Sequence, residues 1–293
     1  MIDEHGEGAE SPFRSGFVSI VGRPNVGKST LVNRILGEKV TITSPSPNTT
    51  RTAVRGVLNG DGFQAVLVDT PGLHRPRTAL GVRLNEAAAA TFGDVDVPIL
   101  VVDASVDIGA GDRFVADRLG SGVVVVLNKI DVSGASRTLT QLEVAAGGLG
   151  LEDAEYFPVS ARTGKGVDAL VEYVSSRLPP GPRYYPSEIV RDVPDPVFVA
   201  ELVREQLLKV AREELPHSIA CRVTEWEWPH ITVEILVERD SQRGMVIGRG
   251  GAVLKAAGSA VRRELPEGAY LELKVRVERD WQRRPEVISR LGF

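Results

Sequence analysis

The chain has 293 residues, enough for about two domains, and its 42% hydrophobic and 25% charged residues are ordinary for a globular protein. A single cysteine, Cys221, excludes an intramolecular disulfide and a cysteine-rich zinc site, and it fits a reducing cytoplasm. The formal net charge of −4 does not indicate a nucleic-acid binder, and no apolar run approaches the ~18 residues of a transmembrane helix.

The chain begins with an acidic, Gly-rich stretch that lacks the basic start and apolar centre of a secretion signal, so we expect a disordered tail over 1–14. Over 15–179, apolar runs alternate with helix-like segments. This alternation predicts an α/β domain, with a mostly parallel sheet covered by helices on both faces. The expected strands are 17–21, 65–68, 98–102, 123–127 and 156–159, and the expected helices are 28–36, 84–92, 111–119, 138–146 and 166–178.

The run Pro179-Pro180-Gly181-Pro182 interrupts the alternation, because these residues cannot continue a helix. We therefore expect a linker at 180–195 and a second domain at 196–293. That domain has a different pattern, with strands that alternate apolar and polar residues, and it is expected to be a smaller α+β fold. Its expected elements are a helix at 196–214, strands at 231–237 and 271–277, and a helical stripe at 254–265.

A P-loop pattern, G-x-x-x-x-G-K-[ST], lies between the first strand and the first helix. Backbone N–H groups of such a loop converge on phosphate oxygens, Lys28 adds positive charge at the β and γ phosphates, and the Ser29 hydroxyl is a Mg²⁺ ligand. The alternative is a chance Gly-rich turn, which the flanking strand and helix disfavour. The predicted phosphate-binding residues are Gly22, Arg23, Pro24, Asn25, Val26, Gly27, Lys28, Ser29 and Thr30.

The sequence Asn128-Lys129-Ile130-Asp131 follows a buried strand and predicts recognition of guanine. The Asp131 carboxylate can accept from guanine N1–H and N2–H₂ together, whereas adenine presents a bare acceptor at N1 and is rejected. The alternative is an ordinary helix cap or turn. After the last strand, Ser160 and Ala161 are expected to present backbone N–H groups to guanine O6.

Two further segments point to the γ-phosphate. In Asp69-Thr70-Pro71-Gly72, Asp69 can hold a Mg²⁺-bound water and the Gly72 N–H can meet the phosphate, although Pro-Gly alone is also a common β-turn. In Asn48-Thr49-Thr50-Arg51, a threonine can close on Mg²⁺, and we slightly favour Thr50 over Thr49. The predicted metal ligands are thus Ser29, Thr50 and Asp69.

These segments, in this order, resemble the translation-factor-like class of GTPases over residues 17–178. Leu73 stands where Ras-like members carry a water-orienting glutamine, so slow intrinsic turnover is expected. In several members with a hydrophobic residue there, an Asn at the position of Asn25 coordinates K⁺; the alternative, that Asn25 only suits the loop conformation, stays open. The predicted catalytic residues are Asn25, Lys28, Thr50 and Gly72.

The second domain contains Gly248-Arg249-Gly250-Gly251 before a helical stripe, a GxxG pattern. Such a loop between two helices lets a nucleic-acid backbone approach closely, as in KH domains. GxxG alone also fits a plain surface turn, but 239–263 holds six basic residues against one acid. The predicted RNA-binding residues are Arg243, Gly248, Arg249, Gly250, Gly251 and Lys255.

Together, GRPNVGKST, NTTR, DTPGLH, NKID and VERDSQRGMVIGRGG resemble the Era GTPases, of the TrmE-Era-EngA-like family. The resemblance implies a P-loop GTPase domain followed by a type II KH domain, with Mg²⁺ as cofactor and GTP and GDP as ligands. It also implies binding to the 3′ end of 16S rRNA, a role in 30S ribosomal subunit assembly, and a cytoplasmic location with peripheral association at the inner face of the cell membrane. No DNA partner is expected.

The resulting hypothesis is a molecular switch, in which GTP and Mg²⁺ order the segments around Thr50 and 69–74 and thereby reposition the KH domain. Two alternatives come from other classes. One is a P-loop kinase, against which the guanine-recognition segment speaks. The other is a membrane-associated signalling GTPase whose C-terminal domain is a protein-interaction module.

Overall fold

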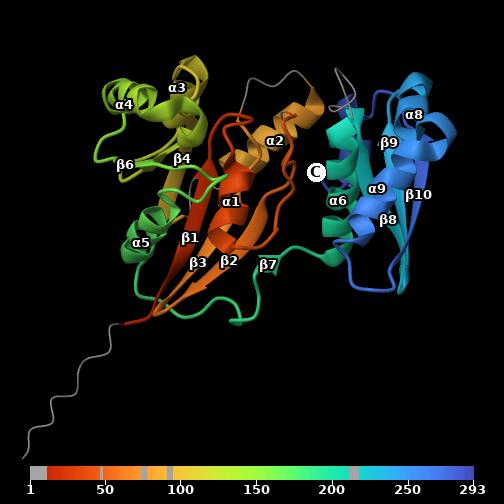
Figure 1. The fold of residues 1–293 in the computed structure, drawn as a ribbon, viewed down its shortest axis with the longest axis horizontal. Coiled ribbons are helices and arrows are strands. Elements are labelled where there is room, and N and C mark those ends of the chain that lie inside the picture. The colour runs from red at the N-terminus through yellow and green to blue at the C-terminus, as the bar shows by residue number, and fades with distance from the viewer. Residues whose placement is uncertain (1–11, 47–48, 74–77, 91–94, 211–217) are drawn as a thin grey trace, which may run out of the picture.

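The computed structural model describes residues 12–46, 49–73, 78–90, 95–210 and 218–293 (Figure 1). Within these residues one sheet has seven strands in the order β6-β5-β4-β1-β3-β2-β7, and a separate sheet has the order β10-β9-β8. The strands of the large sheet are β1 (Arg14–Val21), β2 (Val54–Gly60), β3 (Phe63–Asp69), β4 (Val97–Asp103), β5 (Val124–Asn128), β6 (Glu155–Pro158) and β7 (Arg191–Asp192).

The large sheet is mostly parallel, which confirms the fold class expected from the sequence. β1 pairs in parallel with both β3 and β4, β4 with β5, and β5 with β6, whereas β2 runs antiparallel to β3. β4 and β5 are apolar and buried along nearly their whole length, as strands covered on both faces must be. The sequence analysis missed β2, because the glycines and Asn59 in it are more typical of turns.

Helices cover both faces of this sheet (Figure 1). They are α1 (Lys28–Leu36), α2 (Ala79–Ala89), α3 (Ala110–Ala116), α4 (Ile130–Gly148) and α5 (Val167–Arg177). α1 and α5 bury Leu31 and Leu170 in one apolar cluster, whereas α3 and α4 bury Val115 and Ala145 in another across the sheet. The predicted bounds of α1 are confirmed, but α4 begins eight residues before the expected start because it continues through a non-helical Gly134.

The segment predicted as a linker lies along the edge of the large sheet. The Gln64 side-chain oxygen accepts the N–H groups of Tyr184 and Tyr185 at 2.7 and 3.0 Å, and β7 pairs antiparallel with β2. The expected tail over 1–14 is too long, since Arg14 already belongs to β1 and pairs with Phe63. Residues 1–11 of that expected tail lie outside the described residues.

The second unit is a smaller α+β fold. Its elements are α6 (Asp195–Val210), β8 (Ala220–Glu227), β9 (His230–Val237), α8 (Asp240–Ile247), α9 (Ala252–Arg262), β10 (Tyr270–Val277) and α10 (Pro285–Arg290). β9 pairs antiparallel with β8 and parallel with β10, and α6 and α9 pack on one face of this sheet over a shared apolar cluster. The predicted helix over 196–214 is present as far as Val210, and the rest of it lies outside the described residues.

The two units pack directly on each other. Leu80 and Leu84 of α2 share an apolar cluster with Trp281, Val287 and Ile288 near the C-terminus. Trp281 is fully buried, and its indole N–H donates to the Ser218 carbonyl at 2.9 Å. Ile42, in the segment that follows α1, is also buried in the apolar cluster of the second unit.

Among the residues that the structure describes, no helix combines the length and the apolar character needed to cross a membrane.

Candidate functional site

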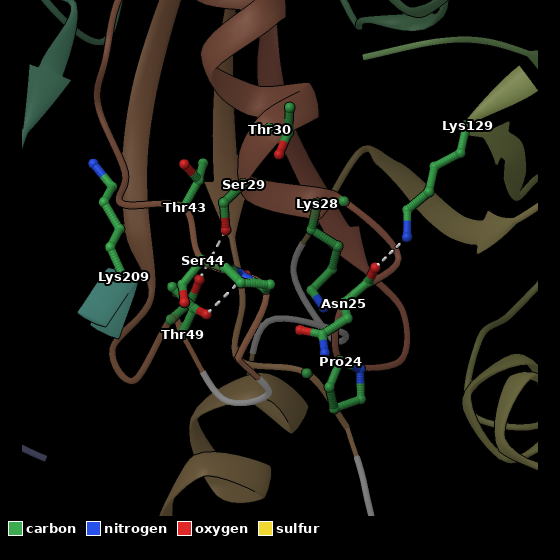
Figure 2. A pocket seen from close by; sticks show the side chains of 14 residues that line it. Pro24, Asn25, Lys28, Ser29, Thr30, Thr43, Ser44, Thr49, Lys129 and Lys209 are labelled. Atoms are coloured by element: carbon green, nitrogen blue, oxygen red, sulfur yellow. Dashed lines mark hydrogen bonds between the residues drawn. The ribbon is translucent and has the colours of Figure 1, made fainter. Parts of the chain in front are cut away.

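The predicted P-loop joins β1 to α1 and borders a cavity of about 530 Å³ (Figure 2). The Lys28 ammonium lies in this loop and donates to the carbonyls of Gly22 and Arg23 at 3.0 and 2.9 Å. Burial lowers the pKa of Lys28 to about 8, although the nearby Asp69 acts in the opposite direction. An anion that entered the cavity would therefore meet a desolvated cation and would favour its charged form.

The cavity collects residues that the sequence predicted from separate segments. Thr50 and Gly72 line it together with the P-loop, and Lys129 approaches from the guanine-recognition segment. Figure 2 also shows Lys209, which comes from α6 of the second unit. The lining residues are Pro24, Asn25, Gly27, Lys28, Ser29, Thr30, Thr43, Ser44, Pro45, Thr49, Thr50, Gly72, Lys129 and Lys209.

Asp69 connects three segments at the floor of the site. Its Oδ2 accepts hydrogen bonds from the hydroxyls of Ser29, Thr41 and Thr50 at 2.8, 2.9 and 3.1 Å. Asp69 is fully buried, and burial raises the pKa of its carboxyl although Lys28 and the three hydroxyls oppose the shift. Its Oδ1 is buried with no hydrogen-bond partner within the described part of the chain. The three predicted metal ligands thus lie together, with one carboxylate oxygen uncompensated.

Of the two candidate threonines, the structure directs Thr50 to the metal-ligand cluster. The Thr50 hydroxyl lies 3.0 Å from Ser29 Oγ, whereas the Thr49 hydroxyl donates to the Ser46 carbonyl at 2.7 Å. Thr49 borders the cavity but its hydroxyl is engaged elsewhere. The geometry supports the choice of Thr50 over Thr49.

The guanine-recognition segment braces the loops around it. The Asn128 amide donates to the Val26 carbonyl and accepts from the Ala161 N–H, both at 2.9 Å, which ties the P-loop to the loop after β6. The Lys129 ammonium lies on the P-loop, donating to the Asn25 carbonyl at 2.7 Å and pairing with Asp103 at 2.6 Å. These contacts hold the three loops in a fixed arrangement.

Asp131 is held in place by its neighbours. It accepts from the Ser160 hydroxyl at 2.6 Å and pairs with Arg162 at 2.6 Å. The Ser160 hydrogen bond is the largest cause and lowers the pKa of Asp131; desolvation opposes it, and the Arg162 charge adds to the lowering. The side chain is therefore an ionised acceptor at neutral pH.

The backbone N–H groups of Ser160 and Ala161 are both used within the chain. Ser160 donates to the Lys165 carbonyl and Ala161 donates to Asn128 Oδ1, each at 2.9 Å. A contact with guanine O6 would have to share or replace these bonds. The expectation for O6 therefore stays a prediction.

The segment after β3 approaches the P-loop closely. A Cβ added to Gly72 would lie 2.8 Å from the Pro24 nitrogen, so only glycine allows this approach. Leu73 is buried in an apolar cluster with residues of β4 and β5, and it presents no polar group to the cavity. His74 lies outside the described residues.

The predicted GxxG loop lies between α8 and α9. Gly248 has φ +74°, and a Cβ there would lie 2.6 Å from a Val253 methyl, so the turn requires glycine. Arg249 is exposed within the loop, Lys255 is exposed on α9, and Arg243 is exposed on α8. The sequence therefore predicted both the loop and the exposed basic side chains around it.

Comparison with known proteins agrees with this architecture. Residues 17–129 match the family described as "50S ribosome-binding GTPase", and residues 214–282 match the KH domain family. The GTPase Era of Mycobacterium bovis (strain BCG / Pasteur 1173P2) is 46% identical to this chain, and the alignment covers 96% of this chain and 99% of that protein. The chain belongs to the Era GTPase family. As a member of the family it is a GTPase, hydrolysing GTP to GDP and phosphate.

Solved Era structures have the same fold over nearly the whole chain. An Era variant from Aquifex aeolicus bound to GDP and AlF₄⁻ has a TM-score of 0.89 and 36% identity, covering 95% of this chain and 99% of that one. Era in complex with MgGDPNP and a segment of 16S ribosomal RNA has a TM-score of 0.90 and 36% identity, covering 96% and 99%. These matches confirm the predicted order of an Era-type GTPase domain and a KH domain.

The sequence analysis missed several residues of the Era-type site. Thr41 bonds Asp69, Asp103 pairs with Lys129, and Arg162 covers Asp131. Asp103 is the last residue of β4, as Asp69 is the last residue of β3, so its place at the end of a buried strand was a usable signal. Lys209 had no such signal, because only the packing of the two domains brings it to the cavity.

One predicted side chain points elsewhere. The Arg23 guanidinium bonds Asp112 of α3 at 2.6 Å, and Asp112 is almost completely buried. Only the Arg23 carbonyl takes part in the P-loop, as an acceptor for Lys28. Arg23 therefore fastens the loop to α3 with its side chain.

Proposed function

We propose that this chain is a GTP-dependent switch that binds 16S rRNA through its KH domain and acts in assembly of the 30S ribosomal subunit. The main support is that a solved Era complex contains MgGDPNP and 16S rRNA on a fold that matches 96% of this chain. The local support is the convergence of Ser29, Thr50 and Asp69 beside the P-loop cavity.

The cavity residues suit a nucleoside triphosphate. We assign the P-loop residues to the phosphates, with Lys28 leaving the two loop carbonyls to meet the β and γ phosphates. Once Lys28 and the loop N–H groups contact the phosphates, charge that develops on the phosphate during water attack is stabilised without further rearrangement. Leu73 offers no group to orient the water, which supports slow intrinsic turnover.

The donor set fits Mg²⁺. Two hydroxyls and a carboxylate are hard oxygen ligands, and nucleotide-bound Mg²⁺ takes one or two carboxylates together with substrate phosphates. A cation bound nearby would compensate Asp69 Oδ1, which is buried and has no hydrogen-bond partner among the described residues. We propose that Ser29, Thr50 and Asp69 hold Mg²⁺ directly or through water, and that the ion, when bound, supplies charge that neutralises the phosphates.

Arg249, Lys255 and Arg243 are proposed to bind RNA phosphates, while the glycines of the GxxG loop let the backbone approach. The outer parts of the hypothesis, a contact with the 30S subunit, peripheral membrane association and repositioning of the KH domain by GTP, stay predictions. So do the domain bounds 15–179, 180–195 and 196–293.

Asn25 has two interpretations that one experiment separates. It has φ +66°, a conformation that Asn tolerates well, and it borders the cavity, where its side-chain oxygen could hold K⁺. If Asn25 holds K⁺, GTP hydrolysis is faster in K⁺ than in Na⁺ at equal ionic strength, and Asn25→Ala removes the difference. Equal rates in the two salts would leave only the conformational role.

Exchanging the base-reading carboxylate for an amide should change the preferred nucleotide. In Asp131→Asn the side chain can no longer accept both guanine donors but can donate to xanthine O2. We expect GTP affinity to fall by roughly 10²-fold or more and xanthosine triphosphate to bind better than GTP, as measured by competition with a fluorescent nucleotide. Asp107→Asn, at an exposed carboxylate, is the control. Retained GTP preference in Asp131→Asn would contradict the assignment.

Reversing two charges at the GxxG loop should weaken RNA binding alone. We expect Arg249→Glu with Lys255→Glu to lower affinity for single-stranded RNA from the 3′ end of 16S rRNA by at least roughly tenfold, with GTP affinity unchanged, by fluorescence anisotropy. Arg118→Glu with Arg137→Glu makes the same charge change on the exposed surface of the GTPase domain. If both double variants bind RNA as the wild type does, the second domain is better explained as a protein-interaction module.

A further inference from the structure

Three consecutive residues link the proposed metal site to the KH domain. Thr50 directs its hydroxyl toward Ser29 and Asp69. Its neighbours on both sides contact the other domain, Thr49 through its carbonyl and Arg51 through its side chain. Groups of the GTPase domain therefore hold the segment at Thr50, and groups of the KH domain hold it at Thr49 and Arg51.

Arg204 of α6 holds the Thr49 carbonyl. Its Nη2 donates to that oxygen. The guanidinium also forms an ion pair with Glu201, to which Nε donates at 2.8 Å and Nη2 donates as well. The side chain is completely buried, so water cannot take over as a donor. Burial alone would lower the pKa of Arg204, but Glu201 outweighs it and the pKa is raised, which keeps the guanidinium charged. A charged side chain is buried here only because it is paired and hydrogen-bonded.

Arg51 makes a matching contact one residue beyond Thr50. Its Nη1 donates to the Ile219 carbonyl at 2.7 Å, and its guanidinium carbon lies 5.4 Å from the centroid of the Trp281 ring. The Arg51 residue is 3% exposed. Residues on both sides of Thr50 are thus fixed to the KH domain by buried groups.

The same face of α6 also contacts an earlier part of the segment. Glu205 is one residue beyond Arg204, accepts the Thr43 N–H at 3.0 Å, and pairs with Lys39 at 2.7 Å. Ile42 lies between Lys39 and Thr43 in the chain and is buried in the apolar cluster of the KH domain. Besides Arg204, α6 therefore holds this segment at Lys39 and Thr43.

We propose that Arg204 is a positioning residue for GTP hydrolysis: by fixing the Thr49 carbonyl from the KH domain, it holds the Thr50 hydroxyl at the metal site. This inference rests on the proposed metal role of Thr50. Removing the guanidinium leaves the Thr49 carbonyl without its buried donor, and the segment gains freedom at the point where Thr50 must be placed. Binding of Mg²⁺ with GTP is affected because it uses Thr50, whereas binding of GDP, which lacks the γ-phosphate, is not.

The test uses the full chain with Arg204→Met, Arg204→Lys and Thr50→Ala. Arg204→Met is expected to lower kcat for GTP hydrolysis by roughly tenfold, to raise the half-saturating Mg²⁺ concentration severalfold, and to leave GDP affinity within about twofold. In the nucleotide-free protein, amide hydrogen exchange over 49–52 should be faster. Arg204→Lys keeps the charge beside Glu201 but cannot bond both Glu201 and the Thr49 carbonyl. Its kcat, half-saturating Mg²⁺ concentration and amide exchange rate should therefore lie between those of the wild type and Arg204→Met.

The control is Arg222→Met, which removes an arginine paired with Glu234 on the sheet of the KH domain, away from the segment. The positioning role would be overturned if folded Arg204→Met showed the Mg²⁺ dependence and the amide exchange of the wild type. If Arg204→Met does not fold, the same result in Arg204→Lys would overturn it. A loss of GDP affinity equal to the loss of kcat would also overturn it, because that pattern indicates general disruption. If Thr50→Ala hydrolysed GTP at the wild-type rate, the metal role of Thr50 itself would be contradicted. If Thr50→Ala lost hydrolysis while Arg204→Met kept it, only the inference about Arg204 would be contradicted.

Discussion

The buried carboxylate of Asp69 is the interaction on which the site depends. A carboxylate removed from water is costly unless charges or hydrogen bonds compensate it, and here three hydroxyls share one oxygen while the other oxygen has no partner among the described residues. The three hydroxyls come from α1 and from two points of the segment that follows it. Partial compensation of one charge thus gathers the P-loop, the Thr50 segment and the end of β3, and leaves one carboxylate oxygen without a hydrogen-bond partner among the described residues.

The parallel sheet makes this gathering possible. The P-loop follows β1, and Asp69 and Asn128 are the last residues of β3 and β5. All three therefore lie at the carboxyl ends of parallel strands and meet at one edge of the sheet. Side chains then brace the loops against each other, with Asn128 joining two of them and Lys129 lying across the first.

Much of this site could be predicted from the sequence, because its residues lie at fixed offsets from strands that are strongly apolar. The P-loop and Asp131 follow such strands, Asp69 ends one, and the GxxG loop lies between two helices as expected. The strand β2 was not predicted, because its glycines and Asn59 are more typical of turns. The contacts of Arg204, Glu205 and Lys209 could not be predicted either: these residues look like the polar face of an amphipathic helix, and only the packing of two domains shows that this face is covered.

We propose that Asp69 is a buried carboxylate that requires Mg²⁺ beside the nucleotide. This role is tested by comparing GTP affinity in excess Mg²⁺ with that in a chelator, for the wild type and for Asp69→Asn, whose neutral amide occupies nearly the same space. Mg²⁺ is expected to strengthen GTP binding to the wild type by roughly tenfold or more, and this gain should nearly disappear in Asp69→Asn. An undiminished gain in folded Asp69→Asn would contradict this role.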